Sequence, residues 1–328
     1  MKIFILTSLF FAFVPVHACT SFTLTDDVHA LLCHNEDWVN PNTRIWFVPA
    51  VASHYGCEFV GFDDNWGQGG MNTAGLAYDW VSGYKAQWER GPNMMTVKGN
   101  PSELMLQTCA TVDQAIVFFQ THWEPSFSNG NILVADRSGV SVRIGARDGV
   151  LTIKMKKTFQ GFGYGGKIVS KMQSEDSQPT LSNAEKILQA ARQLGKGGTK
   201  YSTVYDIKSG TVFLFPVPGS EDIVAFNLDQ ELKKDGHFYD MPMINEQLKH
   251  EPKLLSLMKP MPGQSRDHDT GQNRRDKGAL DCGESISAIR TRLGGNLNTP
   301  ASAANTSGMG LTRLSKPGPS SNPNHTFL

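Results

Sequence analysis

Apolar and polar positions alternate in short stretches between residues 19 and about 240, and this period of two predicts β-strands. Turn-forming pairs join several of these stretches, which favours antiparallel hairpins. The pairs are Ser138-Gly139, Asp148-Gly149 and Ser209-Gly210. The alternating positions are Phe22 and Leu24; Val140, Val142 and Ile144; Leu151, Ile153 and Met155; Tyr201, Thr203, Tyr205 and Ile207; and Val212 and Leu214.

Two segments have the pattern of a helix start. Thr111-x-x-Gln114 and Ser182-x-x-Glu185 have capping-box spacing, in which a hydroxyl side chain accepts from a backbone N–H group of the first turn. Helices mixed with hairpins predict one α+β domain over residues 19–250.

The composition changes after Tyr239, since Phe327 is the one aromatic residue beyond it. Gly, Ser, Asn, Pro and scattered charges dominate from about Pro262. Such a segment buries too little apolar surface to offset the entropy lost on ordering. We expect a disordered polar tail over residues 251–328, with a short helix near Leu254 to Met258.

The first eighteen residues predict a signal peptide. Lys2 precedes an apolar run from Ile3 to Val16, and Val16-His17-Ala18 resembles a signal-peptidase site before Cys19. The run is shorter than the roughly 20 residues that span a bilayer, so stable membrane insertion is not expected. We expect an exported protein, periplasmic or extracellular, that begins at Cys19.

Formal net charge is zero because 31 Lys and Arg residues balance 31 Asp and Glu residues. The basic residues are scattered, which argues against a nucleic-acid partner and favours a small molecule. The other four cysteines, Cys33, Cys57, Cys109 and Cys282, could pair in three ways that the sequence does not separate. A homo-oligomer is left open.

An N-terminal cysteine combines a nucleophile and a base in one residue. Its α-amino group has a reference pKa of about 8 and its thiol one of about 8.5, so the amine can take the thiol proton near neutral pH. The same cysteine could instead be lipidated, because Val16-His17-Ala18-Cys19 partly fits a lipobox. Acylation would block the amine and prevent this catalysis.

Five separated blocks, from Cys19 onward, resemble the choloylglycine hydrolase family, which includes bile salt hydrolases and penicillin V acylases. The blocks are Cys19-Thr20-Ser21-Phe22, His34-Asn35-Glu36-Asp37-Trp38, Gly70-Met71-Asn72-Thr73-Ala74-Gly75-Leu76, Ile132-Leu133-Val134-Ala135-Asp136 and Thr199-Lys200-Tyr201-Ser202-Thr203-Val204-Tyr205-Asp206. The resemblance implies an N-terminal nucleophile hydrolase fold, a four-layer αββα sandwich of mainly antiparallel sheets.

The resemblance also implies three catalytic residues. Cys19 would be the nucleophile, Asp37 would hold the thiol and the α-amino group in place, and Asn72 would donate to the oxyanion. His34 stands where the family usually has Arg, which removes a permanent charge, and we interpret it as a pocket residue. Gln160 is the weak candidate for the second oxyanion amide.

The family's late arginine has no convincing counterpart in Arg192 or Lys200, and its role stays unassigned. His54-x-x-Cys57 and Cys33-His34 lack a second pair at structural-zinc spacing, so neither a metal site nor a cofactor is predicted.

The sequence therefore predicts a cysteine amidohydrolase that cleaves a linear N-acyl amide through a Cys19 thioester, with its own α-amine as base. Conjugated bile salts, penicillin V and N-acyl homoserine lactones are the candidate substrates. Two alternatives remain: a non-catalytic, lipid-anchored binding protein on the same fold, and an acyltransferase.

Overall fold

The structure is a computed structural model, and it describes residues 19–216, 219 and 222–258. The predicted signal peptide, residues 1–18, and all but the start of the predicted tail lie outside the described residues. Residues 251–258 continue the folded part, with strand β15 (Lys253–Leu254) and the 3-10 helix η3 (Leu255–Leu257). The short helix expected near Leu254 to Met258 is thus present as one 3-10 turn.

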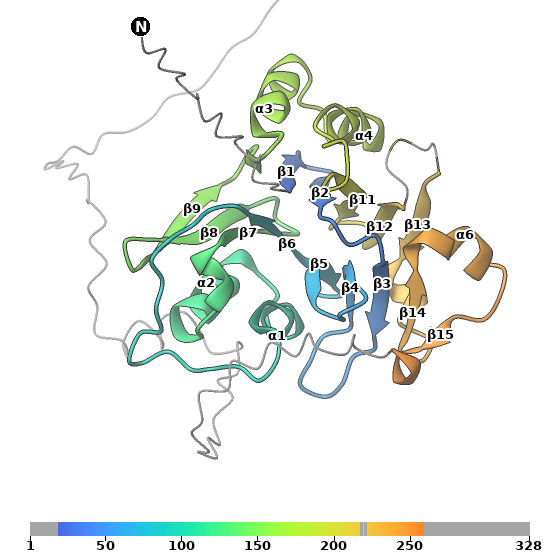
Figure 1. Cartoon of the computed structure of the whole chain (residues 1–328), viewed down its shortest axis with the longest axis horizontal. Coiled ribbons are helices and arrows are strands. Elements are labelled where there is room, and N and C mark those ends of the chain that lie inside the picture. The colour runs from blue at the N-terminus through green and yellow to red at the C-terminus, as the bar shows by residue number, and fades with distance from the viewer. Residues whose placement is uncertain (1–18, 217–218, 220–221, 259–328) are drawn as a thin grey trace, which may run out of the picture. The chain divides into compact units, whose positions relative to one another are not determined.

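Two antiparallel sheets form the centre of the described chain (Figure 1). The six-stranded sheet has the order β10-β1-β2-β11-β12-β13. Its strands are β1 (Thr20–Thr25), β2 (Ala30–Asp37), β10 (Gly161–Gly163), β11 (Thr199–Asp206), β12 (Thr211–Phe215) and β13 (Val224–Asn227).

The nine-stranded sheet has the order β15-β14-β3-β4-β5-β6-β7-β8-β9. Besides β15, its strands are β3 (Thr43–Val48), β4 (Cys57–Phe62), β5 (Gly67–Asn72), β6 (Leu76–Ser82), β7 (Gly130–Asp136), β8 (Ser141–Arg147), β9 (Val150–Lys156) and β14 (His237–Asp240).

Helices cover the outer face of each sheet, so the layers run helix, sheet, sheet, helix (Figure 1). Helices α1 (Pro101–Thr108) and α2 (Val112–Thr121) pack on the nine-stranded sheet. Helices α3 (Gly166–Glu175) and α4 (Leu181–Ala190) pack on the six-stranded sheet. The shorter elements are η1 (Pro125–Ser128), α5 (Leu228–Glu231), η2 (Met241–Met243) and α6 (Ile244–Gln247).

Successive side chains of β1 point to opposite faces of the six-stranded sheet, so they pack in two different layers. Phe22 and Leu24 pack outward against Ile187 of α4. Cys19 belongs to the core between the sheets, and the odd-numbered positions of β1 therefore face the second sheet. This alternation places the first residue after the predicted cleavage site inside the sandwich.

The predicted hairpins are confirmed: β7–β8, β8–β9 and β11–β12 pair antiparallel across the three predicted turns. Thr111 caps α2 by accepting from the N–H of Gln114, as predicted. The predicted start of α4 at Ser182 is wrong, because Thr180 is the cap and accepts from the N–H of Asn183.

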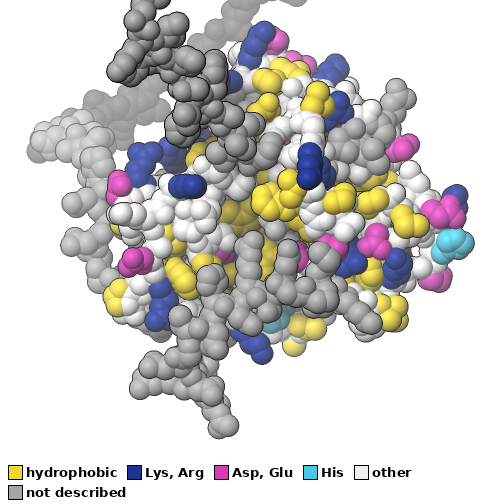
Figure 2. Space-filling model, in the orientation of Figure 1, with side chains coloured by type: hydrophobic (Ala, Val, Ile, Leu, Met, Phe, Trp, Pro, Cys, Tyr) yellow, Lys and Arg dark blue, Asp and Glu magenta, His cyan; other side chains and the backbone are white. Residues whose placement is uncertain are grey.

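Two further features concern the surface and the thiols. None of the described helices is long and apolar enough to cross a membrane. On the face shown in Figure 2, Lys and Arg side chains are interspersed with Asp and Glu. Cys19, Cys33, Cys57 and Cys109 are buried and form no disulfide; Cys282 lies outside the described residues.

Candidate active site

The Cys19 side chain lies between the two sheets, directly before β1, and only 4% of the residue is exposed. Its thiol donates to Oε1 of Glu36 over 3.3 Å, and the sulfur lies 3.9 Å from the carbonyl oxygen of Asp37. Its backbone carbonyl accepts from the N–H of Tyr164 over 3.1 Å. The thiol is therefore held against the end of β2.

Gly163 on β10 allows the chain to pass close to Cys19. Its φ is +106°, and a Cβ at this position would collide with the carbonyl oxygen of Cys19. Only glycine meets both conditions without strain. The N–H of Gly163 also donates to the Tyr84 hydroxyl over 3.1 Å, which connects β10 to the segment after β6.

Strand β2 brings His34 and Glu36 to the same face, because they are two positions apart. The intervening Asn35 points the other way and donates to the carbonyl of Leu188 on α4 over 2.9 Å. His34 and Glu36 are both buried between the sheets, together with Cys19. The sequence block that carries the family resemblance is thus divided by the strand into a site face and a packing face.

His34 lies between two carboxylates. Its Nε2 is 3.4 Å from Oε2 of Glu36 and 3.3 Å from Oδ1 of Asp79, and its Nδ1 is 2.6 Å from the Ser21 hydroxyl. Nε2 can donate to a carboxylate only when it carries a hydrogen, in the Nε2–H tautomer or in the charged imidazolium. The structure therefore brings the predicted pocket residue His34 close to Cys19.

Asp79 on β6 completes this cluster from the nine-stranded sheet. One of its carboxylate oxygens accepts from the N–H of Trp80 over 2.9 Å. Burial raises the pKa of Asp79 well above its ordinary value, and the nearby Glu36 raises it further. The pKa of Asp79 is thus raised by the same cluster that surrounds Cys19. Nothing in the sequence around Asp79 indicated a site residue.

Asp37 ends β2 and is also buried. Its Oδ1 accepts from the Thr199 hydroxyl over 2.6 Å, while its Oδ2 has no hydrogen-bond partner among the described residues. Burial raises the pKa of Asp37 to about 7, although the Thr199 hydrogen bond opposes this shift. Lys200, next along β11, also lowers it.

The Cys19 thiol is protonated in its resting state. Burial raises its pKa well above the ordinary value, and the charges of Glu36 and Asp37 raise it further. The donor atoms of Cys19, His34 and Glu36 lie within 4.8 Å of one another, the spacing that a shared metal ion would need. The hydrogen bond from the thiol to Glu36 accounts for this approach without an ion.

Asn72 is not brought to this cluster. Its side-chain amide donates to the carbonyls of Leu106 and Cys109 over 2.6 and 2.7 Å, and its Oδ1 accepts from the N–H of Leu76 over 2.9 Å. Its neighbour Met71 faces the core between the sheets, so Asn72 faces α1 on the other side. Both amide hydrogens are used, and these contacts leave none for an oxyanion.

Gln160 is adjacent to β10, but its side chain reaches the other sheet. In the orientation that satisfies both ends of its amide, it donates to the carbonyl of Lys154 over 3.0 Å and accepts from the N–H of Arg143 over 3.1 Å. Its contacts are thus with β8 and β9 rather than with Cys19.

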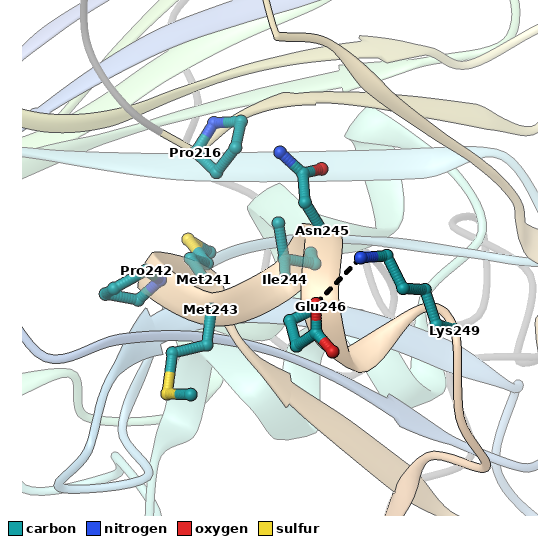
Figure 3. A pocket seen from close by; sticks show the side chains of 8 residues that line it. All are labelled: Pro216, Met241, Pro242, Met243, Ile244, Asn245, Glu246 and Lys249. Atoms are coloured by element: carbon teal, nitrogen blue, oxygen red, sulfur yellow. Dashed lines mark hydrogen bonds and ion pairs between the residues drawn. The ribbon is translucent and has the colours of Figure 1, made fainter.

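Two surface hollows lie among the described residues. One has a volume of about 380 Å³ and is formed by η2, α6 and Pro216, with an ion pair between Glu246 and Lys249 at its rim (Figure 3). The other, of about 300 Å³, is lined by Tyr84, by the acidic Asp148 and by four basic residues, Lys85, Arg143, Arg147 and Lys154. Tyr84 also contacts Gly163 on β10, but neither Gly163 nor Cys19 lines this hollow.

Arg143 forms the inner wall of that second hollow. Its guanidinium stacks over the rings of Tyr84 and Phe162 at 4.5 and 4.2 Å from their centroids. Phe162 pairs with Ser21 on β1. The Arg143 guanidinium therefore packs against β10, the strand that pairs with β1.

The layers and the strand pairing confirm the predicted αββα sandwich, and the fold matches that of two amide hydrolases. The chain is similar to penicillin V acylase from Agrobacterium tumefaciens, with 13% sequence identity and a TM-score of 0.55. That match covers 68% of this chain and 91% of the acylase.

Two variants of conjugated bile acid hydrolase from Clostridium perfringens are also similar, at 14% identity with TM-scores of 0.54 and 0.55. These matches cover 67% and 72% of this chain and 96% and 98% of the hydrolase chains. No protein-family model and no curated protein sequence matches the chain. At such identities the likeness establishes the fold.

Proposed function

We propose that this chain is an exported cysteine amidohydrolase that cleaves a linear N-acyl amide through a thioester on Cys19. The observation that carries the proposal is the position of Cys19. The residue lies directly before β1, and its thiol contacts Glu36 and Asp37 at the end of β2. The fold shared with penicillin V acylase and conjugated bile acid hydrolase supports it.

Removal of residues 1–18 would give Cys19 a free α-amino group. In the proposed reaction this amine accepts the thiol proton, and the sulfur attacks the amide carbon. The C–N bond then breaks, the departing amine takes the proton, and water hydrolyses the thioester. The unpartnered Oδ2 of Asp37 supports a role in holding the α-ammonium group.

The similar enzymes and the hollow beside Tyr84 support a proposal for the substrate class. The two similar enzymes are named for penicillin V and conjugated bile acids. The basic lining around Tyr84 and Arg143 suits a substrate that carries a carboxylate or another anionic group. We propose an N-acyl amide with such a group as substrate.

The test uses protein purified after export, with N-terminal sequencing to establish that it begins at Cys19. Penicillin V, a glycine-conjugated bile acid and an N-acyl homoserine lactone are offered, and amine release is measured together with the intact mass of an acyl-enzyme. Cys19→Ala should abolish turnover, while Cys33→Ala, a buried thiol on the outer face of β2, should retain it. Turnover by Cys19→Ala would contradict the mechanism.

Two results would redirect the proposal. A fatty acid on the α-amine or thiol of Cys19 would favour a lipid-anchored binding protein, because the blocked amine has no base function. Acyl transfer to an added amine, faster than hydrolysis, would favour an acyltransferase on the same nucleophile.

A further inference from the structure

We infer that Glu36 is a second catalytic residue, whose carboxylate takes the proton of the Cys19 thiol and returns it to the departing amine. This inference rests on the proposed amide hydrolysis and adds an acceptor besides the α-amino group. It concerns a residue that the sequence analysis treated only as part of the resemblance block.

The contact between the two side chains is direct. Oε1 of Glu36 lies 3.3 Å from the Cys19 sulfur, and both residues are buried between rigid strands of the two sheets. The other carboxylate oxygen lies 3.4 Å from Nε2 of His34, and Ser21 fixes the opposite side of that ring over 2.6 Å. Nε2 of His34 and Oε2 of Glu36 are thus within ion-pair distance, but neither atom has a hydrogen-bond partner among the described residues.

The groups around Cys19 disfavour a free thiolate, so the thiol proton needs a nearby acceptor when the sulfur attacks. The titratable groups that face this pair are His34, Asp37, Asp79 and Tyr201. Burial and the carboxylates raise the pKa of the thiol, so a thiolate beside an ionised Glu36 is disfavoured. If the proton moves onto Glu36, the pair keeps one negative charge in total and this repulsion disappears.

The proton and electron changes balance without another reactant than water. Oε1 takes the proton from sulfur as the sulfur lone pair forms a bond to the amide carbon. The C–N bond then breaks, and the departing amine nitrogen takes the proton from Glu36. The acyl group remains on sulfur as a thioester. Water next attacks the thioester, giving a proton to Glu36; the C–S bond breaks, and sulfur recovers that proton.

The first test measures thiol chemistry and needs no substrate. Protein that begins at Cys19 is treated with iodoacetamide between pH 5.5 and 10, and modification of Cys19 is followed by peptide mass. Near pH 6 the α-amino group is protonated and cannot accept the thiol proton, so the rate there tests the contribution of Glu36. Near pH 6 we expect the Glu36→Gln variant to be alkylated at least about tenfold more slowly than wild type. Near pH 10 we expect its rate to equal or exceed the wild-type rate.

A role limited to charge predicts the opposite sign. If Glu36 only repels the thiolate, its removal lowers the thiol pKa, and Glu36→Gln reacts faster than wild type across the range. Equal or faster alkylation of Glu36→Gln near pH 6 would therefore overturn the inference.

The second test measures turnover of the best substrate found above. Glu36→Gln should lower kcat/KM about 10²-fold through kcat, and Glu36→Asp should recover part of it because the carboxylate is kept on a shorter stem. Glu103→Gln, which removes a half-buried carboxylate from α1 on the other side of the nine-stranded sheet, should keep wild-type kcat/KM. Wild-type kcat in folded Glu36→Gln would overturn the inference.

The two proposals fail in different ways. If Cys19→Ala still turns over substrate, the proposed function fails whatever the alkylation profile shows. If Cys19→Ala is inactive but Glu36→Gln behaves as wild type in both tests, Cys19 remains the nucleophile and Glu36 is not its base. Thermal unfolding of each variant identifies any loss that comes from misfolding.

Discussion

A single asparagine connects the β5–β6 turn to the helix layer. The Asn72 amide donates to two carbonyls at the end of α1, and its carbonyl oxygen accepts from Leu76 across the turn. Gly75 completes the turn with a φ of +85°, a conformation that glycine adopts without strain. The side chain thus satisfies three buried backbone groups at once.

Asn72→Ala should therefore reduce stability rather than catalysis. We expect a loss of about 3 kcal/mol in the free energy of unfolding, because two buried carbonyls and one N–H lose their partner. Urea denaturation measures this loss, and kcat of the folded fraction should stay near wild type. A 10²-fold lower kcat at unchanged stability would instead restore the oxyanion role that the family resemblance implied.

The residues of the site were partly predictable. The predicted signal-peptide boundary pointed to Cys19, and the resemblance pointed to His34 and Asp37, which lie beside it. Glu36 could have been found from its two-residue spacing to His34 in a strand. Asp79 could not, because it reaches the cluster from the other sheet and no local pattern encodes that packing.

At the scale of elements, the start of α4 illustrates a capping choice between two hydroxyl residues. Thr180 has extended backbone and accepts from the N–H of Asn183, whereas Ser182 lies within the first helical turn and is exposed. Capping-box spacing favoured Ser182, because Glu185 stands three residues after it, whereas Asn183 stands three residues after Thr180. Backbone conformation decides, since a cap residue lies outside the helical region.

Thr180→Ala should therefore cost about 1 kcal/mol of stability, and Ser182→Ala should cost less than about 0.5 kcal/mol. The same urea titration compares the two variants, which remove a hydroxyl from neighbouring positions. Equal losses for both would contradict the assignment of the cap to Thr180.

Hairpins were predictable because strand period and turn residues are local. Sheet order was not: β1 pairs with β10 and β2 pairs with β11, which joins segments more than a hundred positions apart. Such pairings depend on the packing of whole layers, which the alternation within one strand does not specify.

At the scale of the whole molecule, the core contains acidic groups with raised pKa values. Burial is the first cause for Glu58, Asp79, Asp37 and Glu103, the last two reaching a pKa of about 7. Each takes up a proton at higher pH in the folded state than in the unfolded state. Their stabilising contribution is therefore complete below the unfolded pKa and is lost as pH rises through the folded value.

Glu103 isolates this effect, because it lies on α1 outside the candidate site. Its carboxylate accepts from the N–H of Gly67 over 2.7 Å and from Asn100 over 3.1 Å. The other titratable groups that interact with it are Asp64, Tyr78 and Cys57. Its pKa rises from 4.5 to about 7, so its contribution falls between those two pH values.

From pH 5 to pH 8, the free energy of unfolding of the wild-type protein should fall by about 2 kcal/mol more than that of Glu103→Gln. The glutamine amide is neutral at both pH values and can still accept from the N–H of Gly67. Urea titrations at the two pH values measure the difference. Glu175→Gln, at an exposed position of α3, is the matched control and should follow wild type. If Glu103→Gln also follows wild type, Glu103 is ionised in the folded protein at pH 5, and its burial does not raise its pKa.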